Sequence, residues 1–530
     1  MKRWIACGLM VLTAALSAHA ISNVNRTSAE TLNDDGNDIV YAEIYDNGDS
    51  VVFLKKDTLN AQQGDWSFFL YSLSAGDTRG VIKYAGPSVF YGFSAGPAQT
   101  VLYTGQPING VRSIYYGGFA GDSALLVNGA AYPAYVSSRQ TYNFAYVKDS
   151  NSIFVAGMQS DTAALSSPAV RVLDMEDTAG TIRYVRWSPD ALSLVFTVEA
   201  TAESTASIYV LRNVQTLAQK ASANDSSINS VPESVPVRVT TDTYYNTNPH
   251  FVGGDSFVLY NRAIPYRQFK FSSFSDTGGC TSIILTRSNW DAVMIERSSG
   301  NIFAVDTNTL TSTVGSAANS RGYILLVSDN SDTDGDLSFS TMVTGLSVTA
   351  ATSGTYYFPA NVQLTFQAGA APTSTFYVAS DTPKSRMRYD TVMAPVSAVV
   401  VAVQVYASVP SDSIDKQKIQ VTLTYQDIDI QGLVELSAVG LVHDTTTPNA
   451  WRSAGSTLNR SLNSVTITPP HFSTFAVGGN STFDVVLQGQ GCLIERGTHR
   501  RNILTALRDV RDRLLCFRLG RAVVGAYYGD

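Results

Sequence analysis

A short pattern of apolar and polar positions recurs along the first two thirds of the chain, and its clearest copy begins at Arg183. There an apolar run, Tyr184–Trp187, is followed by Ser-Pro-Asp at Ser188–Asp190. Proline fixes φ and aspartate bonds its own backbone, so this tripeptide predicts a turn. The runs Leu192–Phe196 and Ile208–Leu211 predict two further strands, the first buried on both faces. One such meander cannot bury its own faces, so copies must pack beside it.

Degenerate copies of this pattern occur on both sides of it. They lie at Ala42–Asp57, Tyr91–Gly105, Phe144–Met158 and Asn248–Arg262, with later strands expected at Asn301–Thr307 and Gly322–Thr341. Their spacing, roughly 40–60 residues, is typical of the blades of a β-propeller. The pattern therefore predicts an all-β protein that begins with a propeller of about six or seven blades over residues 35–342.

The repeat resembles the WD-like blade of TolB-type β-propellers. In that family an aromatic residue precedes Ser-Pro-Asp-Gly, an apolar strand, a polar hairpin and an Ile-Tyr-Val strand. Arg186–Phe196 with Ile208–Leu211 fits this order best, and Ala191 stands where the family has glycine. The resemblance implies a fold rather than a function, because such propellers serve as binding platforms, enzyme gates and scaffolds alike.

After about Met342 the pattern changes to short strands with turns between them and few helical stretches. Pro395–Pro410 and Ile419–Tyr425 are two of these predicted strands. The series predicts an antiparallel β-sandwich over residues 343–486. Val421–Gly479 resembles a sandwich module common near the C-terminus of bacterial surface and secreted proteins, related to one in ankyrins and netrin receptors.

Some eukaryotic relatives of that module cleave themselves at a His-Phe-Ser tripeptide, which stands here at residues 471–473. The resemblance implies that Ser473 would attack the preceding carbonyl carbon while His471 assists. The alternative, which we favour, is that Phe472 and Phe475 belong to the core of the last strand and His471 caps it.

Residues 489–530 carry the one clearly helical pattern. Apolar residues recur there at about 3.6 positions with arginines between them. They are Ile503, Leu504, Leu507, Val510, Leu514 and Leu515. The segment resembles the CFI-box C-terminal tail of some bacterial secreted proteins, through Cys492–Ile494 and Arg511–Leu515. This Arg-rich tail could contact an anionic membrane surface, dock on an acidic partner or pack on its own sandwich.

The first twenty residues have the pattern of a cleaved secretory signal. Lys2 and Arg3 precede an apolar stretch, Trp4–Leu16, and Ala18–Ala20 is an A-x-A cleavage site. We therefore expect an extracytoplasmic location, whether periplasmic, secreted or cell-surface. The sequence leaves open the disulfide state of the three cysteines that follow the signal. They are Cys280, Cys492 and Cys516.

Composition narrows the function classes. Only 15% of the 530 residues are charged, and the net charge of −7 argues against general nucleic-acid binding. The chain contains no HExxH, paired CxxC or phosphate-loop motif. Gly92–Gly96 matches the G-x-S-x-G nucleophile elbow around Ser94, but Pro97 and a β-like run follow where that motif needs a helix. We therefore do not expect a serine hydrolase.

One stretch resembles the start of a calcium-binding loop. Its oxygen-bearing residues alternate around a glycine and are Asn330, Asp332, Asp334 and Asp336. Alternate carboxylates can wrap one hard cation, but Thr341 stands where such a loop has its last glutamate. The alternative, which we favour, is a propeller hairpin whose Asp-Gly makes a tight turn. Calcium is the only cofactor that the sequence suggests.

Together these features predict a non-catalytic interaction protein of the bacterial cell envelope, whose propeller binds a protein or glycan ligand. The alternatives are a propeller hydrolase or lyase acting on extracellular polymers, and a surface protein that cleaves itself before Ser473. Carboxylates converging at the propeller channel would favour the enzyme. Tyrosine, serine and threonine side chains there would favour binding.

Overall fold

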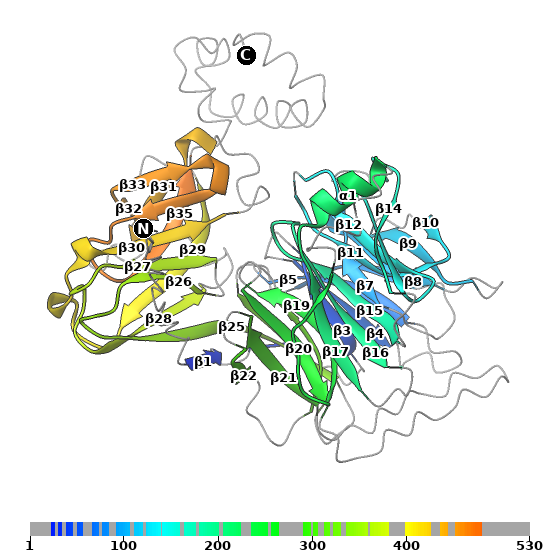
Figure 1. The fold of residues 1–530 in the computed structure, drawn as a ribbon, viewed down its shortest axis with the longest axis horizontal. Helices are drawn as coiled ribbons and strands as arrows, with labels where there is room; N and C mark the ends of the chain where they lie inside the picture. The colour runs from blue at the N-terminus through cyan, green and yellow to red at the C-terminus, as the bar shows by residue number, and fades with distance from the viewer. Residues whose placement is uncertain are drawn as a thin grey trace, which may run out of the picture.

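The computed structural model describes strands over most of the chain and, among the described residues, one α-helix, α1 (Val214–Ser222) (Figure 1). The described residues are 23–26, 30–33, 39–45, 50–56, 66–73, 77–83, 92–105, 111–119, 123–138, 140–159, 164–175, 180–200, 205–223, 235–252, 256–263, 290–297, 300–305, 312–318, 322–329, 335–358, 361–380, 398–425, 435–443 and 451–479. The expected signal, Arg-rich tail and cysteines lie outside them. No helix in the described ranges is long and apolar enough to cross a membrane.

The first part of the chain forms successive groups of four antiparallel strands. The first three groups are β3 (Ile39–Ile44), β4 (Ser50–Lys56), β5 (Trp66–Ser72) and β6 (Asp77–Lys83); β7 (Phe93–Ala95), β8 (Thr100–Gly105), β9 (Ser113–Gly118) and β10 (Ser123–Asn128); β11 (Ala130–Tyr135), β12 (Phe144–Lys148), β13 (Ser152–Ala156) and β14 (Val170–Asp174). The next two are β15 (Gly180–Trp187), β16 (Leu194–Ala200), β17 (Ala206–Leu211) and β18 (Val237–Arg238); β19 (Tyr245–Val252), β20 (Phe257–Ala263), β21 (Trp290–Glu296) and β22 (Ile302–Ala304).

A further group joins the two ends of this part. It consists of β23 (Ser312–Ala318), β24 (Tyr323–Asp329), the start of β25 (Gly335–Val348) and β2 (Glu30–Asn33). The first strands of the groups lie side by side in the order β3, β7, β11, β15, β19, β23, and β23 lies against β3 again. The groups therefore form a closed ring, which is the arrangement of a β-propeller.

The predicted repeat at Arg183 occupies β15, β16 and β17. Consecutive residues of β16 point to opposite faces of the sheet and pack on different neighbours. Phe196 lies in a core shared with the preceding group, and Val195 lies in a core shared with the next group. In the turn, Leu192 N donates to Asp190 Oδ1 at 2.9 Å. Ala191, at the family's glycine position, has a φ of 58° and is buried. The turn therefore needs left-handed backbone there, as the family's glycine would imply.

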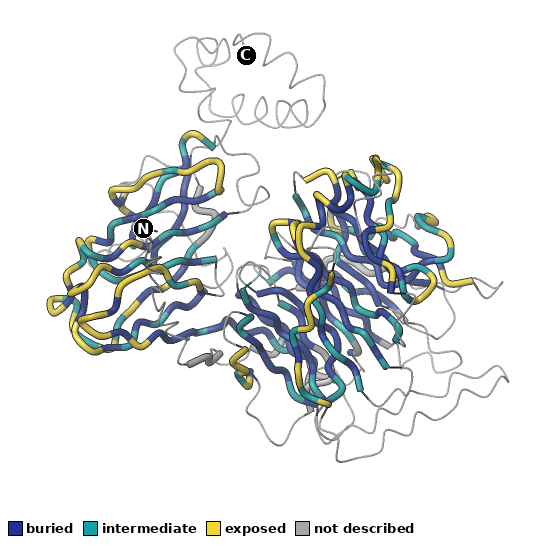
Figure 2. The backbone as a smooth tube through the Cα atoms, viewed as in Figure 1, coloured by how far each residue is buried: buried dark blue, intermediate teal, exposed yellow. Residues whose placement is uncertain are grey.

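Two stacked sheets follow, called here the two-sheet region. One contains the end of β25 with β28 (Ser374–Ser380), β29 (Ala398–Ala407), β35 (Thr474–Gly479), β31 (Val439–His443) and β32 (Trp451–Ser453). The other contains β26 (Gly354–Phe358), β27 (Val362–Phe366), β30 (Ile419–Thr424), β34 (Ser464–Ile467) and β33 (Ser456–Asn459). Short 3₁₀ turns occur at η1 (Pro97–Gln99), η5 (Ser411–Ser413), η6 (Lys416–Lys418), η7 (Glu435–Ser437) and η8 (Arg460–Leu462). Leu364 and Val421 of one sheet share a buried core with Phe376 and Phe475 of the other. Figure 2 shows buried residues along the strands of both sheets.

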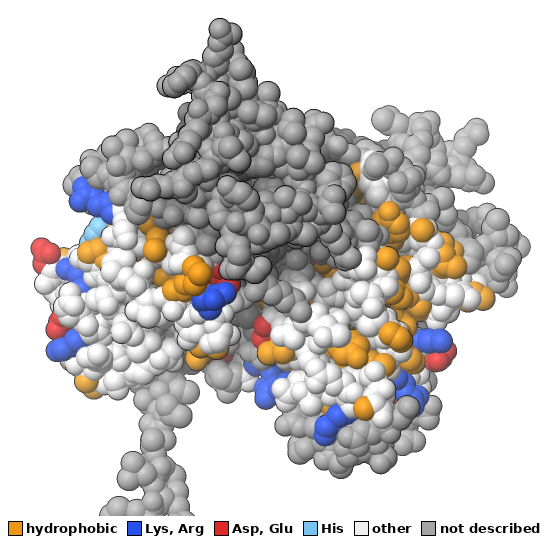
Figure 3. All heavy atoms as spheres, turned by 90° about the horizontal axis from the view of Figure 1, so that it is seen from above, with side chains coloured by type: hydrophobic (Ala, Val, Ile, Leu, Met, Phe, Trp, Pro, Cys, Tyr) orange, Lys and Arg blue, Asp and Glu red, His pale blue; other side chains and the backbone are white. Residues whose placement is uncertain are grey.

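One continuous strand connects the propeller and the two-sheet region. Gly335–Thr341 of β25 pairs with β24, and Val343–Val348 pairs with β28. Two N-terminal strands lie along it as well, β2 in the propeller and β1 (Asn23–Arg26) beside Met342–Gly345. The change of partner falls between Thr341 and Val343, so the chain passes from one region to the other within a strand. On the face seen in Figure 3, charged side chains of both signs are scattered over the described surface.

Candidate functional site

Three neighbouring inner strands of the propeller are bulged at equivalent positions. Their register with the next strand shifts around Tyr132 in β11, Tyr184 in β15 and Asn248 in β19. These residues have φ values of 53°, 50° and 50°. Left-handed backbone costs a non-glycine residue about 1–2 kcal/mol, and bulges re-aim side chains beside functional sites. The repeated bulge marks the propeller centre as the place to look for a site.

A group of polar and aromatic side chains meets there, called here the mouth cluster. It consists of Tyr41, Tyr132, Arg183, Tyr184, Glu199 and Tyr245. The hydroxyls of Tyr41 and Tyr184 lie 2.8 Å apart, and the ring centroids of Tyr184 and Tyr132 lie 5.4 Å apart. The cluster draws on five strands, β3, β11, β15, β16 and β19, although Tyr41 and Tyr184 are 143 positions apart in the chain.

Ionic hydrogen bonds hold the mouth cluster together. Arg183 forms an ion pair with Glu199 and donates from Nη1 to the Tyr132 hydroxyl at 3.0 Å. The Tyr245 hydroxyl donates to Glu199 Oε1 at 2.6 Å. Such bonds are stronger than neutral ones and fix the direction of each group. The cluster is therefore ordered before any ligand arrives.

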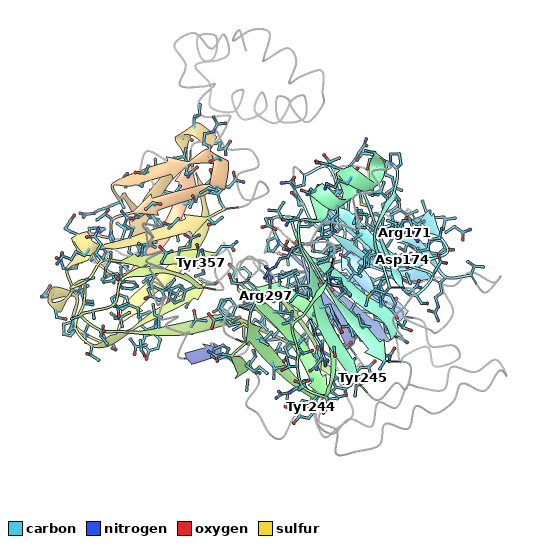
Figure 4. All side chains as sticks on the ribbon, in the orientation of Figure 1. Arg171, Asp174, Tyr244, Tyr245, Arg297 and Tyr357 are labelled. Carbon is cyan, nitrogen blue, oxygen red and sulfur yellow. The ribbon has the colours of Figure 1, made fainter. Side chains whose placement is uncertain are left out.

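Part of the mouth cluster is open to solvent. Tyr41, Tyr184 and Tyr245 are half-buried, and 31% of the Arg183 side chain is exposed. Tyr245 is the first residue of β19 and lies near the lower edge of the propeller in Figure 4. A ligand can thus reach the tyrosine rings and the guanidinium.

Burial keeps the tyrosines protonated. It raises the pKa of Tyr41 to about 12 and raises the pKa values of Tyr132, Tyr184 and Tyr245 as well. A base needs a pKa near the working pH, so these hydroxyls act at neutral pH as hydrogen-bonding groups.

A second set of charged groups, called here the inner triad, consists of Glu43, Arg186 and His250. All three are buried. Arg186 forms an ion pair with Glu43, and its Nε donates to His250 Nε2 at 3.3 Å. Burial alone would raise the pKa of Glu43, but the charges of Arg186 and His250 outweigh it and lower that pKa. Glu43 is therefore a poor proton donor at neutral pH.

The inner triad and its neighbours also occupy main-chain groups on the inner strands. Arg186 donates from Nη2 to the Phe93 carbonyl at 3.0 Å and from Nη1 to the Val185 carbonyl at 2.9 Å. Asn248 Nδ2 donates to the Ser316 carbonyl at 2.8 Å. Side chains thus occupy carbonyls on the first strands of three groups, β7, β15 and β23.

The serine of the nucleophile-elbow motif, Ser94, forms hydrogen bonds within the ring of strands. Ser94 is buried in β7, where its hydroxyl accepts from Tyr135 N at 3.2 Å and donates to the Ala95 carbonyl at 3.1 Å. The 3₁₀ turn η1 and strand β8 follow it. This hydroxyl joins two neighbouring groups of strands.

The residues predicted for self-cleavage, His471 and Ser473, lie just before β35. His471 Nε2 lies 3.0 Å from the His443 carbonyl oxygen, and the Phe472 ring packs edge-on against Phe376 at 5.3 Å. The Ser473 carbonyl accepts from Val405 N at 2.9 Å. No hydrogen bond joins His471 to Ser473 in this described stretch. The arrangement agrees with the core-and-cap alternative, and self-cleavage stays a prediction.

The predicted calcium ligands are only partly placed. Asn330, Asp332 and Asp334 lie outside the described residues, and Asp336 pairs with Ser328 in the ladder of β24 and β25. The ladder ends where Asp329 pairs with Gly335, so residues 330–334 connect two antiparallel strands. Among the residues that the structure describes, no group of three or more histidine, cysteine, aspartate or glutamate side chains could hold a metal. Calcium stays a prediction.

Sequence reasoning missed the mouth cluster and the inner triad. Their residues lie in predicted strands, but register between strands far apart in sequence is set by tertiary packing. A usable signal existed: a charged residue inside a first strand, as at Glu43, Arg183 and Arg186, is unusual where apolar packing is expected.

Comparison with known proteins adds little. The chain matches no known family model and no curated protein. Over 59% of its length it is similar to a solved structure assigned as TolB from Agrobacterium tumefaciens, with 11% identity, a TM-score of 0.35 and 93% of that chain covered. The WD40 repeats of RRP9 give 8% identity and a TM-score of 0.36, and the match covers 59% of this chain and 97% of that one. The β-propeller domain of the Trilobed protease from Pyrococcus furiosus gives 8% identity and a TM-score of 0.32, and the match covers 58% of this chain and 95% of that one. Likenesses this weak carry no argument, and the propeller assignment rests on the closed ring of strands.

Proposed function

We propose that this chain is a non-catalytic interaction protein of the bacterial cell envelope, whose propeller binds a protein or glycan ligand at the mouth cluster. The observation that carries the proposal is the partly exposed set of tyrosines around Arg183. Tyrosines offer large contact area at low entropic cost and a hydroxyl that fixes orientation. This is the composition that favours binding over catalysis.

The central carboxylates support the same conclusion. Glu43 and Glu199, the carboxylates of the inner triad and mouth cluster, each form an ion pair with an arginine. A propeller hydrolase or lyase needs a carboxylate or another group poised to exchange a proton. Two carboxylates already paired with arginines are poorly suited to that role.

The finer architecture belongs to this proposal as well. The ring of first strands supports a six-bladed propeller, with β2 as the outer strand of the last blade. The two stacked sheets support a β-sandwich that carries it. The signal-like first twenty residues support export, and the Arg-rich tail supports localisation or assembly at the envelope.

The test is a binding screen of the full chain, purified from its exported fraction, against arrays of glycans and of envelope proteins. Tyr184→Ala should weaken binding of any hit by about tenfold or more, as expected for an aromatic contact at the centre of a site. The matched control is Tyr357→Ala, since Tyr357 is 54% exposed on β26 of the two-sheet region (Figure 4).

Equal losses in the two variants, or none in either, would place binding away from the propeller centre. Shortened polymer products in the same incubations would show an enzyme and overturn the proposal.

A further inference from the structure

We infer that the mouth cluster recognises a neutral sugar residue of a glycan. The inference rests on the proposed function and names its ligand. Three features carry it: the charge balance of the propeller centre, the occupied carbonyls of the inner strands, and the hydrogen-bonding capacity of Arg183.

Charges at the propeller centre are paired internally. Arg183 is matched by Glu199, and Arg186 by Glu43. An anionic ligand would bring its charge next to Glu199, which costs free energy in a partly desolvated site. The whole chain also carries a net charge of −7, so its field does not attract an anionic polymer. The pairing therefore favours an uncharged ligand.

The inner strands offer few main-chain partners for an extended peptide. A peptide that adds to a sheet edge needs free N–H and C=O groups along that edge. Here the carbonyls of Phe93, Val185 and Ser316 accept from Arg186 or Asn248. His250 Nδ1 lies 3.2 Å from the Asn248 carbonyl oxygen. These carbonyls are closed to a peptide strand, which favours recognition by side chains and thus a sugar over a peptide.

The groups that remain suit a sugar ring. A guanidinium has five N–H donors. Arg183 uses Nε for Glu199 and Nη1 for Tyr132, and no contact to Nη2 is present in the described ranges. The half-buried rings of Tyr184 and Tyr245 offer apolar faces beside this donor. A neutral sugar presents a C–H face together with hydroxyls, so one residue could stack on a ring and accept from Nη2.

The test uses the full chain and three probes: an oligomer of a neutral hexose, an oligouronate of equal length, and an uncharged extended peptide. We expect the neutral oligomer to bind, with a Kd that changes less than about twofold between about 50 mM and about 500 mM salt. Tyr245→Phe should weaken it by less than about tenfold, since the ring stays and Arg183 still pairs with Glu199. Arg183→Lys should weaken it by about tenfold or more, because lysine lacks the planar fork.

The outcomes separate the two proposals. Salt-sensitive binding of the oligouronate, or binding of the peptide, that Arg183→Lys abolishes would overturn the neutral-sugar inference and leave the proposed binding site standing. Hits insensitive to Arg183→Lys and to Tyr184→Ala, while thermal unfolding shows all variants folded, would overturn both.

Discussion

Two sets of partly exposed tyrosines in the described part of the chain differ in what holds them. Tyr377 and Tyr406 of the two-sheet region face each other across a strand pair, with ring centroids 5.0 Å apart, and Tyr406 is 44% exposed. Strand register alone brings them together. The tyrosines of the mouth cluster come from separate strands around the ring, and their hydroxyls bond to Arg183, Glu199 or each other.

This difference teaches why exposure alone does not identify a site. A stacked pair on a sheet stabilises the sheet by about 0.2–1 kcal/mol and needs no further explanation. A cluster that keeps charged groups out of bulk water costs free energy, so its presence calls for a function. The predictions below test whether the propeller centre behaves as such a cluster.

The largest expected effect is from breaking the inner triad. Arg186→Leu leaves Glu43 buried without its cation, and removing one partner of a buried pair costs about 3–5 kcal/mol. Arg171→Ala is the control, because Arg171 is 52% exposed in its ion pair with Asp174 (Figure 4). Loss of an exposed pair should cost less than about 1 kcal/mol. Urea unfolding of both variants measures the difference, and equal costs would contradict a buried, coupled triad.

A smaller effect is expected at the glycine beside Tyr132. Gly92 has a φ of 101°, and a Cβ there would lie 3.0 Å from Tyr132 Cδ1. Gly92→Ala should therefore cost about 1–2 kcal/mol for the backbone and also displace a ring of the mouth cluster.

Gly129→Ala isolates the backbone part of that cost. Gly129 has a φ of 69°, with nothing within 4 Å of an added Cβ. Both alanines should lower the free energy of unfolding, but only Gly92→Ala should weaken ligand binding. A binding defect shared by both variants would show that general destabilisation is the cause.

The sequence predicted the propeller because its signal is local. The apolar runs and the Ser-Pro-Asp turn at Arg183 set strand, turn and strand within about 30 residues. The two-sheet region follows the same kind of pattern, with Phe475 buried in its core and Phe472 partly buried against that core. The closing strand β2 carried no such signal, because Glu30–Asn33 has a single apolar residue, Leu32, which packs against the core at the ring closure.

The candidate site could not be predicted because it depends on how the ring closes. Glu43 and Arg186 meet across 143 positions, and they do so only once the first and fourth groups of strands occupy one ring. The composition of each strand shows that a charge is present, but not which charge opposes it. Only the ring geometry brings Arg183 and Tyr184 together with Tyr41 and Tyr132 in one cluster.

The smallest effect we expect is an alkaline loss of stability that comes from the mouth cluster. The folded protein raises the pKa of Tyr41 from 10.0 to about 12, chiefly by burial. A raised pKa means that the folded state holds the proton more tightly, so this contribution is intact below about pH 10 and is lost as pH rises through about 12. At pH 11 this loss of stability amounts to about 1 kcal/mol.

Tyr41→Phe should therefore lose about 1 kcal/mol less of its free energy of unfolding than the unaltered protein between pH 8 and about pH 11, measured by urea unfolding. Tyr357→Phe, at an exposed position, should follow the unaltered protein. If Tyr41→Phe does so too, the Tyr41 hydroxyl is as well solvated as that of Tyr357, and the mouth cluster is no more than a second surface pair.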